Sequence, residues 1–401
     1  MSGIWLDWVE IKQHTKGRDV YFYGRSEDWV HKAIRGYGDK VIGIIDREVT
    51  YHGSTYLDLP ILPIEDIAKS AHPYFIITAG DFDGIIDILS DLGFEAGDDF
   101  SCSPDFRDYH ILEDIRATRV KLLLASSDYN DRTRARSSEL GGGLFVLDTK
   151  SQNLERKIMG SFRQFVQISS ELWAAVEYVE KQIVIFDFNF NVVKRFELDL
   201  PNYCGIAFDS ETNTCWLLNA GADEIIGVSM TDFREVRRRK FSSRTIGAGH
   251  HINDATFHGD KLYLSYFSLS GGFKAEIFDG GVAALDPFCD EIPLPVIEGL
   301  WKPHTPKFFN GKLYALDSMR GQLVSGKSER LPKFSGFVRG MDKRDNKIFV
   351  GQSSDMYVTE RMARDTVVLN AGVHVCDVKY NATRFIDLPG TMNIHEVALW
   401  S

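Results

Sequence analysis

The spacing of hydrophobic residues changes near residue 118, and the two parts of the chain predict different kinds of structure. In the first hundred residues, the runs DVYFYG, KVIGIID and YFIITAG are apolar almost throughout, as in strands that are covered on both faces. Between and after them, SEDWVHKAIRGYG, PIEDIAKSA and FDGIIDILSDLGF have helical spacing. Alternating strands and helices are typical of a parallel sheet with helices on its faces, so we expect an α/β domain of the Rossmann-like class.

Beyond residue 118, short strands alternate with Gly, Asn and Asp turns, and one strand motif recurs six times. It reads GLFVLD from Gly143, QIVIFD from Gln182, EIIGVS from Glu224, GVAALD from Gly281, GQLVSG from Gly321 and GVHVCD from Gly372. The intervals are 39, 42, 57, 40 and 51 residues. Repeats of this length that hold several strands are typical of β-propeller blades, so we expect six blades. A degenerate seventh blade could lie within the two longer intervals.

The two ends of the repeat region complement each other. Residues 119–159 read as a blade without its innermost strand, and the C-terminal NIHEVALW reads as an innermost strand without a blade. Joining them would close the ring and remove two open sheet edges. The predicted organisation is therefore a Rossmann-like domain over 1–103, a linker over 104–118, and a propeller over 119–401 that the C-terminal strand closes.

Composition narrows the class of protein. The net charge is −11, which argues against a nucleic-acid partner. We expect no signal peptide, because the first residues lack a basic segment followed by an apolar one, and no transmembrane helix, because no apolar run reaches about 18 residues. The five cysteines are scattered, with no CxxC spacing, as in reduced cytoplasmic proteins. The expected protein is cytoplasmic, with no membrane partner.

The starts of the innermost strands carry most of the candidate chemistry. These starts surround one mouth of the central channel in a propeller. Aligning them gives a column of six residues, of which the last four are strongly polar: Val166, Cys204, Asn253, His304, Arg339 and His395. His251 lies two residues before Asn253 and therefore on the same strand face. We expect these polar side chains to converge on the channel axis, although solvated histidines with no function are the alternative.

Two chemistries fit this column. His251, His304 and His395 could hold a catalytic divalent metal, because three histidines are enough to bind one and leave a position open. Without a metal, a histidine could act as a general base while Arg339 holds a carboxylate or phosphate. Asn253 would complete this site. Glu396 and Asp254 occupy the alternate strand face, where we expect them to tie strand starts together or to orient a histidine.

The C-terminal half resembles a bacterial family of β-propeller-like proteins of unknown function. The resemblance rests on HHINDATF at 250–257, GLWKPHTPKFFNGKLYALDSMRGQLV at 299–324, GFVRGM at 336–341 and VGQS at 350–353. The matched positions are His251, Asn253, Pro303, His304, Ser318, Gly321, Arg339, Gly340, Gly351 and Ser353. Asp254 and Thr305 depart from the family pattern, which has Gly and Ser there. This resemblance implies a shared site but no particular reaction.

The N-terminal part is similar to the Rossmann-like nucleotide-sugar-binding domain of bacterial sugar acyltransferases, on VYFYGRSEDW and VIGIIDREVTYHGSTYLDLPILPIEDI. The resemblance implies polysaccharide biosynthesis and a nucleotide or nucleotide sugar held by Gly24, Arg25, Ser26 and Asp46. Asp46 follows Gly24 by 22 residues, near the spacing of an acidic residue that binds ribose hydroxyls. Only Gly24 remains of the usual three glycines, so a purely structural domain is the alternative.

The expected function is therefore an enzyme of carbohydrate metabolism. It would be a lyase, epimerase or hydrolase that acts on a carbohydrate or nucleotide sugar, with His251, Asn253, His304, Arg339 and His395 as the catalytic set and a divalent metal as a possible cofactor. The alternative is a non-catalytic propeller that binds a glycan or a protein, with the N-terminal domain as a sensor or scaffold. A homo-oligomer is compatible with either reading.

Overall fold

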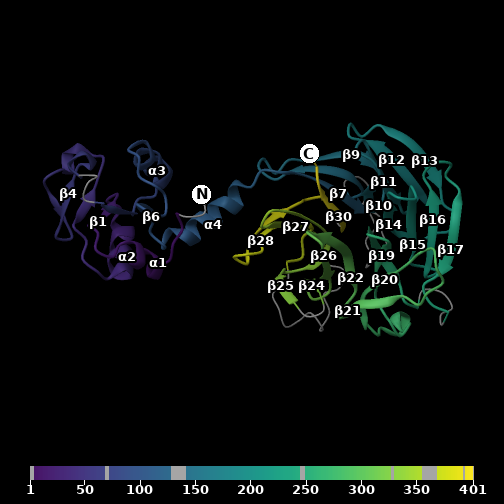
Figure 1. Cartoon of the computed structure of the whole chain (residues 1–401). Coiled ribbons are helices and arrows are strands. Elements are labelled where there is room, and N and C mark those ends of the chain that lie inside the picture. The colour runs from purple at the N-terminus through teal and green to yellow at the C-terminus, as the bar shows by residue number, and fades with distance from the viewer. Residues whose placement is uncertain are drawn as a thin grey trace. The chain divides into compact units, whose positions relative to one another are not determined.

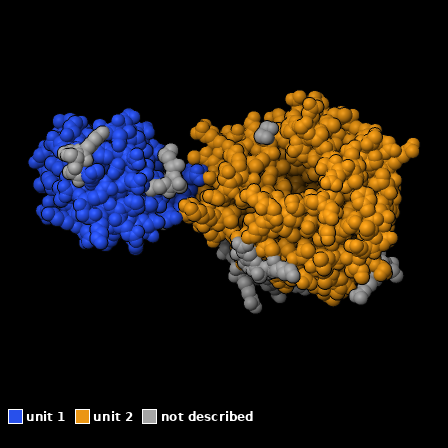
Figure 2. Space-filling view, viewed as in Figure 1, with its two compact units in different colours: residues 1–114 blue, residues 115–401 orange. Residues whose placement is uncertain are grey.

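A computed structural model describes residues 4–67, 72–127, 141–243, 249–326, 329–354, 368–391 and 393–400. The chain divides into two compact units, residues 1–114 and residues 115–401 (Figure 2). The helix α4 (Phe106–Ala117) spans the point of division. No helix in the described ranges combines the length and the apolar character that crossing a membrane requires.

The first unit is built on a mixed sheet of short strands. The strands are β1 (Val20–Tyr23), β2 (Gly43–Ile45), β3 (Thr55–Tyr56), β4 (Leu59–Leu62), β5 (Tyr74–Ile77) and β6 (Phe100–Cys102), in the order β3-β4-β2-β1-β5-β6. The pair β3–β4 is antiparallel, and the other pairs are parallel. The helices α1 (Trp8–His14), α2 (Glu27–Tyr37) and α3 (Phe82–Asp91) complete the unit.

The predicted fold class, a Rossmann-like α/β domain joined to a propeller, is wrong. The structure is nearly all β, with 48% of the chain in strands and 13% in helices, and it shows no Rossmann domain. A Rossmann half needs successive helical crossovers between its parallel strands. Here the connection from β2 to β4 contains only a 3-10 turn (Val49–Tyr51) and the two-residue strand β3. The similarity to the sugar acyltransferase domain fails for the same reason.

The second unit is a six-bladed β-propeller, which confirms the predicted number of blades (Figure 1). The first blade consists of β10 (Phe162–Gln167), β11 (Leu172–Glu177), β12 (Gln182–Asp187) and β13 (Val192–Glu197). The second consists of β14 (Tyr203–Asp209), β15 (Thr214–Asn219), β16 (Glu224–Ser229) and β17 (Glu235–Lys240). The third consists of β18 (Ile252–His258), β19 (Lys261–Tyr266), β20 (Gly280–Leu285) and β21 (Leu294–Leu300). The fourth blade consists of β22 (Pro303–Phe309), β23 (Lys312–Asp317), β24 (Gln322–Ser325) and β25 (Glu329–Lys333). The fifth consists of β26 (Phe337–Arg344), β27 (Lys347–Ser353), β28 (Gly372–Asp377) and β29 (Ala382–Asp387).

The sixth blade combines both ends of this unit. Its innermost strand is β30 (Asn393–Leu399), which pairs antiparallel with β7 (Lys121–Ser127), followed by β8 (Gly143–Asp148) and β9 (Leu154–Met159). This pairing leaves no gap in the ring, so the inner edges of the blades surround a common axis. The surface of this unit is hollowed near its centre (Figure 2).

Hydrophobic side chains fill the spaces between neighbouring blades. Between the second and third blades, the fully buried Trp216 of β15 packs in one cluster with Leu264 and Tyr266 of β19. Between the sixth and first blades, Leu123 of β7 packs with Phe162 and Trp173. The apolar alternation along each blade strand thus builds a core that encircles the axis, and the innermost strands carry polar groups because their other side faces the channel.

Candidate functional site

Each innermost strand has an irregularity in its pairing with the second strand of its blade. The register shifts lie between residues 162 and 165, 203 and 205, 252 and 255, 304 and 307, 339 and 341, and 394 and 396. A bulge of this kind turns side chains out of the regular alternation. The six bulges start at the first, second or third residue of each strand, so they place a ring of side chains near one mouth of the channel.

Glycine is required at one of these bulges. Gly340 has φ +69°, and a Cβ there would lie 2.6 Å from the backbone of Glu396 on the neighbouring strand β30. Only glycine adopts this conformation freely and allows two strands to approach so closely. The contact fixes β26 against β30 and therefore sets the relative height of Arg339 and His395 along the axis.

His304 of β22 is held in one tautomer. Its Nδ1 lies 2.9 Å from the carbonyl oxygen of Lys302 and 2.8 Å from Oγ of Ser318, and its Nε2 lies 2.7 Å from Nδ2 of Asn253. A carbonyl only accepts, so Nδ1 carries the hydrogen and Nε2 accepts from the Asn253 amide. Burial, followed by the charge of Arg339, holds the pKa of His304 well below its usual value. The imidazole is therefore neutral, and both of its nitrogens are engaged.

His395 of β30 lies between two arginines. Nη1 of Arg163 is 2.8 Å from Nε2 of His395, and Nη1 of Arg339 is 2.9 Å from its Nδ1. Oγ of Ser127 is 3.1 Å from Nε2. Burial first, and then the charges of both guanidinium groups, hold the pKa of His395 well below its usual value. Because a guanidinium group only donates, a neutral imidazole is the form that both arginines favour.

Both guanidinium groups also lie over aromatic rings. The Arg163 guanidinium lies over the ring of Tyr178 at 4.2 Å, and the Arg339 guanidinium lies over Phe337 at 4.7 Å. Arg339 is 5% exposed. Within the described part of the chain, no carboxylate forms an ion pair with Arg163, and its Nε has no hydrogen-bond partner. Two like charges around one imidazole are costly at a buried site unless an anion joins them.

His251 is separated from the other histidines. It precedes β18 with φ +51°, and its ring stacks on Phe273 and lies 4.5 Å from Phe267. The Phe267 ring in turn lies 5.2 Å from His304. The Phe267 ring therefore contacts both imidazoles. Burial, and then the charges of Lys302 and the two arginines, lower the pKa of His251 to about 3.

The predicted three-histidine metal site does not assemble. Among the described residues, no group of three or more His, Cys, Asp and Glu side chains has the arrangement to hold a metal ion. The nitrogens of His304 are already bonded, aromatic rings pack against His251, and two guanidinium groups flank His395. A cation next to these arginines would be repelled. We therefore derive no chemistry through a metal.

The structure thus brings together Asn253, His304, Arg339 and His395, but it replaces one predicted member of the column. Val166 lies beyond the bulge of β10, and the bulge itself contains Arg163 and Gln164. The sequence alignment missed Arg163 because it shifted the first blade by three residues. The sequence FRQFVQ contained a signal, because Arg163 comes shortly after the aromatic residue that starts its strand. Arg339 likewise comes two residues after Phe337, which starts β26.

A second polar layer lies one residue further along the strands. Asp254 accepts hydrogen bonds from the amide of Thr305 at 2.9 Å and from its hydroxyl at 3.4 Å, and burial raises the pKa of Asp254 to about 6. Burial also raises the pKa of Glu396 to about 8, although Lys307 opposes this. Gln164 joins three blades, since its amide accepts from Ile206 and bonds both backbone groups of Ala255.

The residues predicted to bind a nucleotide in the first unit have other contacts. Gly24 follows β1 with φ +102°, and a Cβ there would lie 2.2 Å from that of Ala79. The Arg25 guanidinium lies over Tyr51 at 3.9 Å, and Ser26 precedes α2 without capping it. Asp46 follows β2 and accepts from the amide of Glu48. Glu27 and Asp28 in the first turn of α2 oppose a phosphate there. Nucleotide binding stays a prediction.

Comparisons with known proteins support the propeller and the C-terminal resemblance. A family model described as a domain of unknown function (DUF4915) matches residues 259–399. No curated protein is significantly similar in sequence. A chain of a nidogen/laminin complex has 10% identity and a TM-score of 0.51, and the match covers 70% of this chain and 98% of that one. At this identity the likeness shows the fold alone.

Two further solved structures have lower TM-scores and carry no functional argument. A protein of unknown function from Bacteroides caccae has 8% identity and a TM-score of 0.46, covering 70% of this chain and 99% of its own. An auxiliary nutrient binding protein from Bacteroides thetaiotaomicron has 9% identity and a TM-score of 0.42, covering 58% of this chain and 74% of its own. The function must therefore be argued from the axial residues.

Proposed function

We propose that the propeller binds the carboxylate or phosphate group of a small molecule at the axial mouth, between Arg163 and Arg339. The observation that carries the proposal is that both guanidinium groups approach the same neutral imidazole, at 2.8 and 2.9 Å. Neither group can donate to the other, and a neutral imidazole has a single acceptor nitrogen to offer to the two of them. An anion bound between them would accept from both arginines and offset their mutual repulsion.

Sugar acids are the ligand class that we put first. A carboxylate would be held by the arginines, while the ring hydroxyls would meet the neighbouring amide of Asn253 and the hydroxyls of Ser127 and Ser318, which already bond to the two imidazoles. Planar carboxylates and guanidinium groups match in geometry, which favours this class over a simple spherical anion. This class also agrees with the carbohydrate-related function that we expected from the sequence.

Calorimetric titration with D-glucuronate and with inorganic phosphate tests the proposal. We expect at least one of them to bind, and we expect Arg163→Gln to weaken binding by about tenfold or more, because it removes a charged donor from a buried site. Arg195→Gln is the matched control, since this substitution makes the same change in charge at an exposed position on the outermost strand β13. Binding of neither anion, or equal binding by both variants, would refute the proposal.

Catalysis by the same residues is the second candidate. It is favoured by the position of His395, whose neutral imidazole lies beside both arginines of the proposed carboxylate site. A neutral imidazole can remove the proton next to a carboxylate whose developing charge the arginines stabilise, as a lyase or epimerase requires. Proton NMR in D₂O would show whether the hydrogen on the carbon next to the carboxylate of glucuronate exchanges with solvent. Exchange by the parent that is lost in His395→Gln would support catalysis. Binding without exchange would leave a non-catalytic binding protein.

A further inference from the structure

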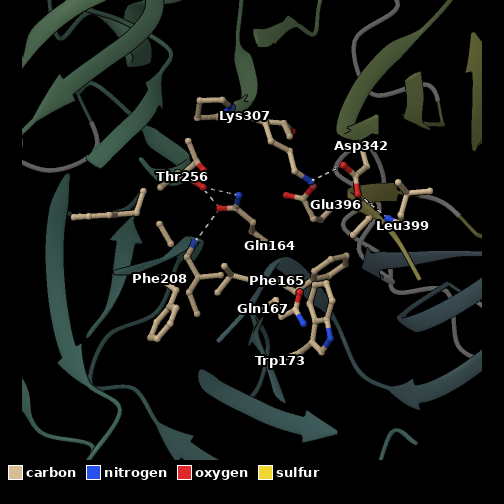
Figure 3. A pocket seen from close by; sticks show the side chains of 18 of the residues that line it. Gln164, Phe165, Gln167, Trp173, Phe208, Thr256, Lys307, Asp342, Glu396 and Leu399 are labelled. Atoms are coloured by element: carbon tan, nitrogen blue, oxygen red, sulfur yellow. Dashed lines mark hydrogen bonds and ion pairs between the residues drawn. The ribbon is translucent and has the colours of Figure 1, made fainter. Parts of the chain in front are cut away.

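A separate cavity of about 350 Å³ lies further along the same channel, where the innermost strands end (Figure 3). Its wall includes Trp173, Phe208, Lys307, Asp342 and Glu396. In Figure 3 the Lys307 side chain reaches toward Asp342 and Glu396 from one side, and Trp173 and Phe208 lie on the other sides. The volume is at the lower end of the range for small-molecule sites.

This cavity is distinct from the arginine site. Two strands contribute to both sites with different residues. The strand β10 provides Arg163 to the mouth and residues 164–167 to the cavity. The strand β30 provides His395 to the mouth, and Glu396, Ala398 and Leu399 to the cavity. Gln164 and Thr305 line the cavity where it adjoins the mouth, and their polar atoms are bonded to neighbouring strands. The channel therefore has two levels with a layer of bonded polar groups at their border.

The charges of the cavity cancel. Nζ of Lys307 lies 3.8 Å from Asp342 and 3.9 Å from Glu396, and it donates to the carbonyl of Met341 at 2.9 Å. Because burial raises the pKa of Glu396 to about 8, this carboxyl is protonated at neutral pH and can donate a hydrogen bond. One ammonium group and one carboxylate remain. A ligand with a net charge of either sign would upset this balance.

Five aromatic side chains form another part of the wall. Trp173 packs edge-on against Phe165 at 5.6 Å, and Phe188, Phe208 and Phe257 also line the cavity. Polar groups therefore meet one part of a bound molecule while aromatic carbon meets the other. A sugar ring has both kinds of surface, with hydroxyl groups around its edge and C–H groups on its faces. A purely apolar molecule would displace water from the ammonium, the carboxylate and the neutral carboxyl without replacing its hydrogen bonds.

We infer that this cavity is a second binding site, for a neutral sugar or a similar neutral polyhydroxylated ring. Asp342 accepts from ligand hydroxyls, Lys307 and Glu396 donate to them, and the aromatic side chains contact the face of the ring. The site does not depend on the arginine site, so it stands whether or not the anion proposal is correct.

Saturation-transfer NMR on the full chain tests the inference, with D-glucose, D-galactose, L-fucose and N-acetyl-D-glucosamine as probes. We expect transfer to at least one of them. Thr256→Phe fills the cavity, because Thr256 lines it and is partly exposed, and should abolish the transfer. Arg163→Gln alters only the mouth and should preserve it. Gln167→Trp, at an exposed position on the cavity wall, is the second blocking variant in case Thr256→Phe does not fold.

The outcomes separate the two sites. Transfer that disappears in a folded blocking variant and persists in Arg163→Gln supports the cavity site. No transfer to any probe in the parent overturns the inference, and so does transfer that survives both blocking variants. Transfer that is lost only in Arg163→Gln overturns it as well, because the sugar then binds at the mouth. D-glucuronate binding by the Thr256→Phe variant reports on the anion proposal independently.

Discussion

Glu396 makes the free energy of unfolding depend on pH, and Glu396→Gln should remove that dependence. The carboxyl is 3% exposed, and its pKa is raised from 4.5 to about 8, first by burial and then by Asp254, while Lys307 and the amide of Val397 act in the opposite direction. A carboxyl with a raised pKa binds a proton on folding. Its contribution to stability is therefore fully present below the unfolded pKa and is lost as the pH rises through the folded pKa.

The size of the effect follows from the pKa values. One proton taken up on folding changes the free energy of unfolding by about 1.4 kcal/mol per pH unit. Between about pH 6 and about pH 8 the parent should lose about 2 kcal/mol that Glu396→Gln does not lose, because the loss levels off near the folded pKa. Asp254 and the histidines titrate in both proteins, so the difference between parent and variant isolates Glu396.

Urea unfolding at both pH values measures this difference. Glu171→Gln is the control, since Glu171 is exposed directly before β11 and should give the same difference from the parent at both pH values. A constant difference between parent and Glu396→Gln across this pH range would mean that Glu396 is already ionised in the folded protein. The charge balance of the cavity would then be wrong.

Three further predictions concern the propeller itself. Gly340→Ala should lower the free energy of unfolding in urea by about 2 kcal/mol or more, because the new Cβ meets the backbone of Glu396. Gly259→Ala is the control, since Gly259 has a similar φ of +61° but open space around it. Removing residues 393–401 leaves the sixth blade without its innermost strand, and we expect aggregation on size-exclusion chromatography rather than a monomeric peak. Gln164→Leu leaves the backbone groups of Ile206 and Ala255 without their partner and should cost about 2–3 kcal/mol in thermal or urea unfolding; equal stability of variant and parent would contradict its bridging role.

Part of this architecture could be predicted from the sequence because it depends on local patterns. Blade strands alternate apolar and polar residues between tight turns, so the six motifs from GLFVLD to GVHVCD predicted the number of blades. Asn253, His304, Arg339 and His395 could be aligned because each lies near the start of an innermost strand. The strand β30 could be assigned to the ring because no blade follows it.

The errors come from features that local patterns do not record. A bulge shifts the register of β10, so Arg163 belongs to the axial ring and Val166 does not. The predicted metal site assumed free imidazole nitrogens, whereas those of His304 are bonded to Asn253 of the third blade and to the carbonyl oxygen of Lys302. In the first unit the apolar runs did become strands, but the spacing of the runs could not show that the crossover from β2 to β4 lacks a helix.

A double-mutant cycle on anion binding tests the central claim most directly. Arg163→Gln, Arg339→Gln and the double variant would be titrated by calorimetry with D-glucuronate, with thermal unfolding as the check on folding. If both guanidinium groups hold one carboxylate, the double variant should bind only slightly more weakly than either single variant, a coupling of about 1 kcal/mol or more. Losses in binding free energy that simply add, or no loss in either single variant, would show that the two arginines do not share an anion.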